Sequence, residues 1–153
     1  MGNISKAERE RVENKLRQYP VIKKRIVNIS ARIRMREAEL EEDHGYSLPA
    51  VSYSGVGGGN TNRVNQREQD AVVRKLEPDR EILRLLNERR KLEAERDAIK
   101  AGLDVLNDIQ SNFVRLRYFR GMQFKGVASK INVSEREAYE IRDEIVGILV
   151  QFF

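Results

Sequence analysis

The residues between Ser134 and Glu144 have the types and spacing that best suit a chemical task. On a helix they would expose a polar face made of Glu135, Arg136, Glu137, Tyr139, Glu140 and Asp143. Such side chains donate and accept hydrogen bonds at base edges, and a helix that carries them fits a DNA major groove. They do not pair a nucleophile with a base, so the chemistry that they predict is recognition rather than catalysis.

A helix-turn-helix is the element that would position this face. The positions expected to point inward are Phe124, Val127, Ala128 and Ile131 on a first short helix and Ala138, Ile141, Ile145 and Leu149 on a second. Between the helices, Asn132 tolerates a left-handed corner and Val133 can fill the core. Ser134 can cap the second helix, with Glu137 completing a capping box. Any other helical hairpin with a polar corner is the alternative, but agreement at this many positions favours the helix-turn-helix.

The charge of this segment opposes simple phosphate binding. Residues 134–144 hold five carboxylates and two arginines, whereas the whole chain carries +5 with a pI near 9.6. DNA-binding proteins gain affinity by neutralising phosphates with Lys and Arg. The basic excess lies elsewhere, with eleven basic and seven acidic groups in residues 1–42 and five against two in residues 101–133. We therefore expect phosphates to meet these flanking helices.

The composition excludes several classes of protein. Charged residues make up 35% of the 153 residues and aromatic residues 7%, which suits long solvated helices. Cysteine is absent, so disulfides and thiolate metal sites are excluded, and no apolar run is long enough to cross a membrane. The single histidine, His44, lies beside a polar linker, and no acidic cluster has metal-ligand spacing. We expect an intracellular, non-enzymatic protein without a cofactor or metal.

Two long amphipathic segments precede the helix-turn-helix. The first runs from about Ser5 to Glu42, and its Pro20 predicts a break or kink near Tyr19. A Gly/Ser-rich linker follows, whose glycine run at 57–59 lacks the Lys-Ser/Thr of a P-loop. The second spans about Gln66 to Leu76 and continues from Pro78 with near-heptad leucines and isoleucines. The two segments predict an antiparallel hairpin, although the same seams could pair between subunits.

The C-terminal part predicts a compact helical unit. Asn107 and Asp108 can cap a helix from Ile109 to Arg120, which Gly121 would end. Its inward residues would be Phe113, Leu116 and either Phe119 or Tyr118. The fold class is all-α, a long helical hairpin or coiled-coil arm plus a three-helix unit. The predicted segments are a basic arm (1–42), a linker (43–66), a charged helix (67–106) and the helix-turn-helix domain (107–153).

The run VRLRYFRGMQFKGVASKINVSEREAYEIRDEI, residues 114–145, resembles the fourth region of bacterial sigma factors. The positions that carry the resemblance are Leu116, Arg117, Tyr118, Phe119, Gly121, Val127 and Ala128. Together with the basic N-terminal helix around LRQYPVIKKRI, the Gly/Ser-rich linker and the charged helix, it is similar to the phage-encoded ArpU/RinA family of late-gene transcription regulators. That resemblance covers most of the chain and is looser in the helical arms.

The family resemblance implies a protein of the bacterial host cytoplasm that binds double-stranded DNA and activates late genes with host RNA polymerase. The DNA face that it implies consists of Ser134, Glu135, Arg136, Glu137, Tyr139 and Glu140, with Lys125 and Arg142 nearby. Arg136 is the candidate for a guanine edge, and Tyr139 for a phosphate or a thymine methyl. Phosphates would be met by Arg115, Arg117, Arg120 and Lys130.

Two alternatives remain open. The first is a phage small terminase subunit or another packaging adaptor that forms a homo-oligomer through its long helices, although such subunits more often carry the DNA unit at the N-terminus. In the second, the sigma-like unit binds RNA polymerase or another protein through its acidic helix. The order of the elements and the sigma-like segment favour the activator.

Overall fold

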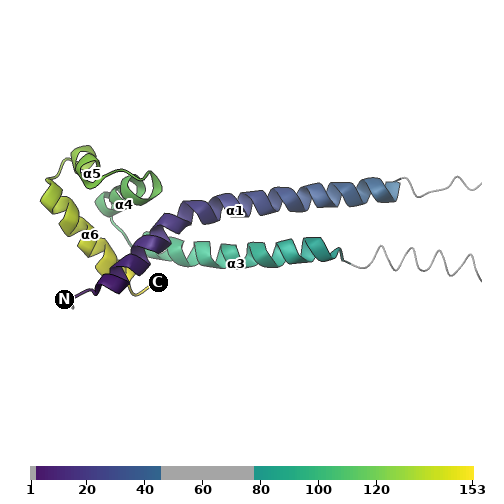
Figure 1. Cartoon of the computed structure of the whole chain (residues 1–153), viewed down its shortest axis with the longest axis horizontal. Helices are drawn as coiled ribbons and strands as arrows, with labels where there is room; N and C mark the ends of the chain where they lie inside the picture. The colour runs from purple at the N-terminus through teal and green to yellow at the C-terminus, as the bar shows by residue number, and fades with distance from the viewer. Residues whose placement is uncertain (1–2, 46–77) are drawn as a thin grey trace, which may run out of the picture. The chain divides into compact units, whose positions relative to one another are not determined.

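The computed structural model describes residues 3–45 and 78–153, and these form an all-helical fold (Figure 1). Its elements are α1 (Lys6–Gly45), α3 (Arg80–Leu103), α4 (Asp108–Val114), the π-helix η1 (Arg115–Phe119), α5 (Phe124–Ile131) and α6 (Glu135–Leu149). They divide into two compact units, Met1–Val27 with Arg90–Phe153, and Asn28–Arg89. Among the described helices, none is long and apolar enough to cross a membrane.

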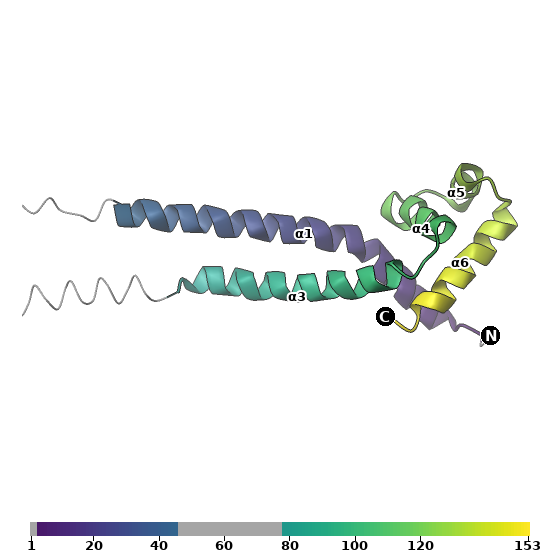
Figure 2. The ribbon, with the colours of Figure 1, turned by 180° about the vertical axis from the view of Figure 1, so that it is seen from behind.

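Helix α1 is one unbroken helix, but it bends in its purple N-terminal part, the region that holds Pro20 (Figures 1 and 2), so the prediction of a break or kink near Tyr19 is met as a kink. Pro20 lies inside the helix, where it removes one backbone donor. Leu16 and Ile22, on either side of it, are both buried, but only Leu16 belongs to the hydrophobic cluster around Phe113. The helix thus accommodates Pro20 by bending rather than by ending. The helix also ends later than predicted, because residues 43–45 of the predicted linker (43–66) are helical. The rest of that linker and the helix predicted from about Gln66 to Leu76 lie outside the described residues.

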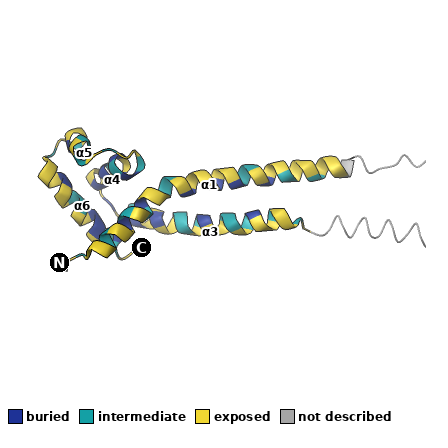
Figure 3. Cartoon of the chain, in the orientation of Figure 1, coloured by how far each residue is buried: buried dark blue, intermediate teal, exposed yellow. Residues whose placement is uncertain are grey.

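In the first unit, α1 and α3 lie side by side and run antiparallel within one chain (Figures 1 and 2). Buried isoleucines and leucines form their seam, namely Ile22, Ile26, Leu92 and Ile99. At the edge of the seam, Lys15 Nζ lies 2.7 Å from Glu95 Oε1. The antiparallel hairpin predicted from the two heptad-like stripes is therefore formed here, and Figure 3 shows the stripe on α1 as dark positions between exposed ones.

The second unit has a thinner seam with arginines beside it. Ile29, Ile33 and Leu85 are buried. Arg36 donates to Asp79 Oδ2 (2.9 Å), and Asp79 Oδ1 accepts from the backbone N–H groups of residues 81 and 82. These contacts lower the pKa of the Asp79 carboxyl, with the Arg36 hydrogen bond as the largest cause. Asp79 thus starts α3 at Arg80, two residues after the predicted start at Pro78.

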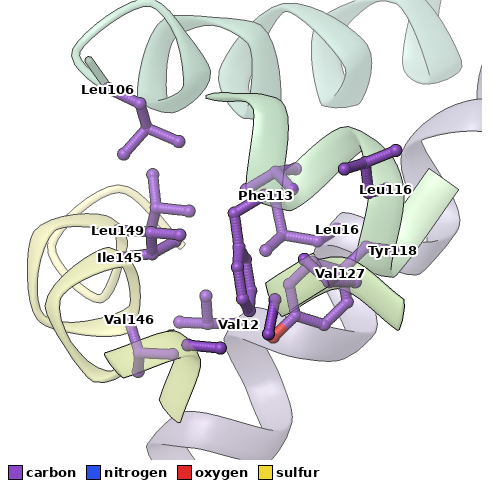
Figure 4. Packing of buried hydrophobic residues seen from close by; sticks show 13 residues of the cluster. Val12, Leu16, Leu106, Phe113, Leu116, Tyr118, Val127, Ile145, Val146 and Leu149 are labelled. Carbon is purple, nitrogen blue, oxygen red and sulfur yellow. The ribbon is translucent and has the colours of Figure 1, made fainter. Parts of the chain in front are cut away.

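A hydrophobic cluster around Phe113 organises the first unit (Figure 4). Phe113 is fully buried, and its ring lies near those of Tyr118 (6.3 Å) and Phe124 (5.9 Å). Val12 and Leu16 of α1 belong to the same cluster and are fully buried. The predicted three-helix unit is therefore completed by the N-terminal helix. This supplies the apolar surface that about fifty residues lack by themselves.

The helix that leads to the candidate interface begins as predicted and continues as a π-helix. Asn107 caps α4 in a capping box with Gln110. The π-helix η1 then follows, and it buries Tyr118, while Phe119 is half-buried and stacks on Tyr19 (5.4 Å). Tyr118 donates from its hydroxyl to Glu13 Oε1 (2.9 Å). A left-handed Gly121 (φ 71°) ends this segment, as its sequence predicts.

Gly102 has a packing role that its sequence position did not reveal. We expected it to weaken the end of the second long helix, but it is buried in the last turn of α3. A Cβ atom here would lie 3.0 Å from Leu149 Cδ2 and 3.4 Å from Phe152 Cβ. The glycine therefore lets the chain end approach α3 closely.

Candidate nucleic-acid interface

The corner between α5 and α6 has the conformation that its residues predict. Asn132 is left-handed (φ 57°, ψ 46°), and the Val133 N–H donates to the Ala128 carbonyl (3.0 Å). Ala128 and Ala138 are buried, and a larger residue at either would separate the helices. Val133 is half-buried against the core. These contacts fix α6 at a defined angle to α5, which is the geometry of a helix-turn-helix.

Ser134 and Glu137 form the predicted capping box at the start of α6. The Glu137 N–H donates to Ser134 Oγ (3.2 Å), and the Ser134 N–H donates to Glu137 Oε2 (2.7 Å). These hydrogen bonds lower the pKa of the Glu137 carboxyl, with the backbone bond from Ser134 as the largest cause. Both residues were predicted to lie on the DNA face. They are exposed at the corner, but their side-chain oxygens already accept hydrogen bonds from the backbone at the start of α6.

The exposed face of the first turns of α6 consists of Glu135, Arg136, Tyr139 and Glu140. The Arg136 side chain is 89% exposed, and its Nε donates to Glu140 Oε1 (3.2 Å). An exposed guanidinium on the first turn of the second helix is free to reorient toward a partner. The structure therefore places the predicted guanine-reading residue where it can be reached.

A stack of rings and guanidinium groups supports Tyr139, and no signal in the sequence predicted it. The Tyr139 and Phe124 rings lie parallel, 4.2 Å apart at 12°. Arg142 lies 5.2 Å from the Tyr139 ring centroid, and Arg117 lies 4.8 Å from that of Phe124. Cations over aromatic faces are attracted by the ring quadrupole. The stack holds the Tyr139 ring in place on the exposed face, and it joins α5, α6 and η1.

The stack also changes the roles open to two predicted site residues. Arg142 is only 15% exposed and lies 2.7 Å from Asp143, so it supports Tyr139 rather than facing outward. Arg117, predicted to meet phosphates, is half-buried and donates to the Met122 carbonyl (2.8 Å). Besides Arg136, the predicted site cations that remain exposed around the helix-turn-helix are Arg115, Arg120, Lys125 and Lys130.

In residues 3–45 and 78–153, no group of His, Asp and Glu residues could hold a metal ion. The side chain of His44 and the glycine run at 57–59 lie outside the residues whose surroundings are described. The candidate interface is thus a polar helix face, supported from behind by an aromatic stack.

The fold and this face define an all-helical protein with helix-turn-helix geometry near its C-terminus. The chain belongs to a family described as "Protein of unknown function (DUF722)", whose model matches residues 21–151. The match covers α1 from residue 21 onward, α3 and the whole of α4 to α6. Comparisons with curated proteins and with solved structures gave no match.

Proposed function

We propose that this protein binds double-stranded DNA sequence-specifically through α6 and acts as a transcription regulator. The observation that carries the proposal is the left-handed corner at Asn132, which fixes α6 against α5 with its first turns exposed. A second helix held in this way is the element that enters a major groove in helix-turn-helix proteins. The positive net charge of the chain fits a polyanionic partner.

Base reading falls to two side chains of different mobility. Arg136 is almost fully exposed and can form a bidentate contact with a guanine edge. Tyr139 is held by the Phe124 ring and suits an apolar contact with a thymine methyl or a hydrogen bond to a phosphate. Arg115, Arg120, Lys125 and Lys130 would supply phosphate contacts. Base contacts specify and phosphate contacts position, so these four should set affinity more than sequence preference.

The carboxylates of α6 repel DNA phosphates less than their number suggests. Glu137 accepts from the corner backbone, Glu140 accepts from Arg136, and Asp143 pairs with Arg142. A carboxylate with a cation beside it repels a phosphate less than a free one does. Affinity then comes from the flanking cations, and α6 contributes specificity.

The finer function that we propose is activation of phage late genes together with host RNA polymerase, in the cytoplasm of a bacterial host. This step rests on the resemblance of residues 114–145 to the fourth region of sigma factors and of most of the chain to late-gene regulators. A homo-oligomer would present two reading helices to paired half-sites.

Footprinting on the DNA upstream of the late genes of the encoding phage or prophage tests this function. We expect one discrete protected site. Arg136→Ala should bind that site more weakly than wild type, by about tenfold or more, because one bidentate base contact is lost. Arg84→Ala is the matched control, since Arg84 is an exposed arginine of the second unit outside the segments that are expected to meet phosphates. Uniform protection of unrelated DNA, unchanged in Arg136→Ala, would contradict the proposal and favour a packaging or assembly role.

A further inference from the structure

A groove of about 1110 Å³ lies within the first unit, between the N-terminal end of α1 and the later turns of α6. Ile4, Ile148 and Val150 supply apolar side chains along it. Gly147 also lines the groove and contributes no side chain, so the groove stays open at that point. Glycine inside a helix costs about 1 kcal/mol relative to alanine. An open apolar groove beside it is a reason for such a glycine.

The polar rim of the groove is acidic. Its charged members are Glu8, Glu140, Asp143, Glu144 and Arg9. Asp143 pairs with both Arg9 (3.6 Å) and Arg142 (2.7 Å), and Glu140 accepts from Arg136. Glu8 and Glu144 are the rim carboxylates that these ion pairs leave for a cation of a partner. The chain as a whole carries +5, yet this surface is negative. A nucleic acid is repelled from such a groove, and a basic partner is attracted.

We infer that this groove binds an amphipathic helix of another protein, one with Lys or Arg residues flanking an apolar ridge. An apolar stripe would lie along Ile4, Ile148 and Val150, and the flanking cations would meet Glu8 and Glu144. Helices of this kind bind in hydrophobic grooves with residues at i, i+3, i+4 and i+7 as anchors. The commitment to a basic helix follows from charge complementarity with the rim.

The groove and the proposed DNA face occupy different parts of α6. Arg136 and Tyr139 lie on its first turns, whereas Glu144, Gly147 and Ile148 lie on its later turns. Glu140 is the one member of both sets, because it lines the groove and accepts from Arg136. A helix bound in the groove therefore leaves Arg136 and Tyr139 exposed. The inference does not depend on DNA binding, and the two can be tested separately.

Fluorescence anisotropy of a labelled model peptide tests the groove on the full chain. The probe is an amphipathic Lys/Leu helix of about 18 residues, roughly five turns. Two comparison peptides are its Glu/Leu counterpart and a scrambled Lys/Leu sequence. We expect saturable binding of the Lys/Leu helix, weakened by added salt, and at least about tenfold weaker binding of the other two. Equal binding of the scrambled peptide would overturn the inference, because it would show charge attraction without a groove.

Two variants separate the rim from the apolar floor. Glu144→Lys reverses one rim charge and should weaken the Lys/Leu helix about fivefold. Gly147→Leu should weaken it about tenfold or more by filling the groove, because a Cβ at Gly147 meets only Ile4 Cδ1, at an ordinary 3.6 Å. The matched controls are Glu37→Lys and Ala98→Leu, both at exposed helix positions outside the groove, and neither should change binding.

Two further measurements keep the outcome unambiguous. Sedimentation velocity should give the same oligomeric state for wild type and Gly147→Leu, since loss of an oligomer in that variant would show that a second copy of the chain occupies the groove. DNA affinity should also stay unchanged in Gly147→Leu. If Glu37→Lys weakens the peptide as much as Glu144→Lys, the groove is not the binding site and the inference fails.

Discussion

The two units differ in how tightly their sequence determines their structure. In the second unit, Asn28–Arg89, the described residues form a narrow stripe of isoleucines and leucines. Ion pairs between arginines and carboxylates, such as Arg36 with Asp79, border the stripe. The first unit instead packs a cluster around Phe113, with aromatic rings from several helices in contact. Many residues could replace one another in the stripe, whereas few fit the cluster. Position-specific packing belongs to the unit that carries the candidate interface.

The largest expected effect contrasts the two packing modes. Phe113→Ala should destabilise the protein by about 3–5 kcal/mol, because Phe113 is fully buried and its loss leaves a cavity. Ile33→Ala, in the stripe of the second unit, should cost about 2 kcal/mol. Urea unfolding measures both changes. Hydrogen exchange then locates them, with loss of protection in α5 and α6 expected for Phe113→Ala only.

Similar loss of protection in α5 and α6 for both variants would remove the contrast. It would show that the units unfold as one and that the stripe supports the helix-turn-helix as strongly as the cluster does. The free energies alone do not decide this, because one value reports the whole chain.

A smaller effect is expected at the hydrogen bond between Tyr118 and Glu13. Burial is the largest cause that raises the pKa of the Tyr118 phenol well above 10, and the nearby Glu13 carboxylate adds to it. Tyr118→Phe removes the bond and should cost about 1–2 kcal/mol at neutral pH. Exposed ion pairs such as Arg32 with Glu81 should contribute less, about 0–1 kcal/mol.

The raised pKa of Tyr118 also predicts an alkaline dependence. The folded state holds this proton more tightly than the unfolded state, so the contribution is complete below about pH 10 and is lost as pH rises toward the folded pKa. The stability difference between wild type and Tyr118→Phe should stay constant up to about pH 10 and shrink between about pH 10 and about pH 12. A difference that stays constant over this range would show that Tyr118 is not held in its neutral form.

The smallest expected effect compares two helical glycines. Gly102→Ala should lower the melting temperature, because the new Cβ would lie 3.0 Å from the fully buried Leu149 side chain. Gly147→Ala should raise the melting temperature, because alanine is favoured over glycine in a helix by about 0.5–1 kcal/mol and its Cβ meets only an ordinary contact. Stabilisation by both substitutions would show that the chain end does not pack closely on Gly102.

Sequence patterns predicted the elements whose signals are local. The corner required a left-handed residue and a cap, and Asn132 and Ser134 have side chains that satisfy these needs within a few residues of the chain. The heptad-like stripes predicted the paired helices for the same reason. Pro20 is a local signal of the same kind, because α1 bends in the region that holds it while the helix stays unbroken (Figure 1).

Contacts between distant residues could not be predicted in this way. The role of Gly102 depends on the chain end, and the burial of Tyr118 rather than Phe119 depends on a π-helix and on Glu13 of α1. The stack of Phe124 on Tyr139 likewise joins two helices. The face of the candidate site was predictable from its spacing. The packing was needed to show which of its residues are exposed, such as Arg136, and which are held by other side chains or the backbone, such as Arg117 and Arg142.

Selection of bound duplexes from a random DNA pool tests the central proposal, that α6 reads a DNA sequence, most directly. We expect wild type to enrich one motif, and Arg136→Ala to lose preference at a guanine of that motif while still binding DNA through the flanking cations. Phe124→Leu should weaken the preference at a neighbouring position by releasing the Tyr139 ring. Enrichment of no motif by the folded wild-type protein would contradict the proposal.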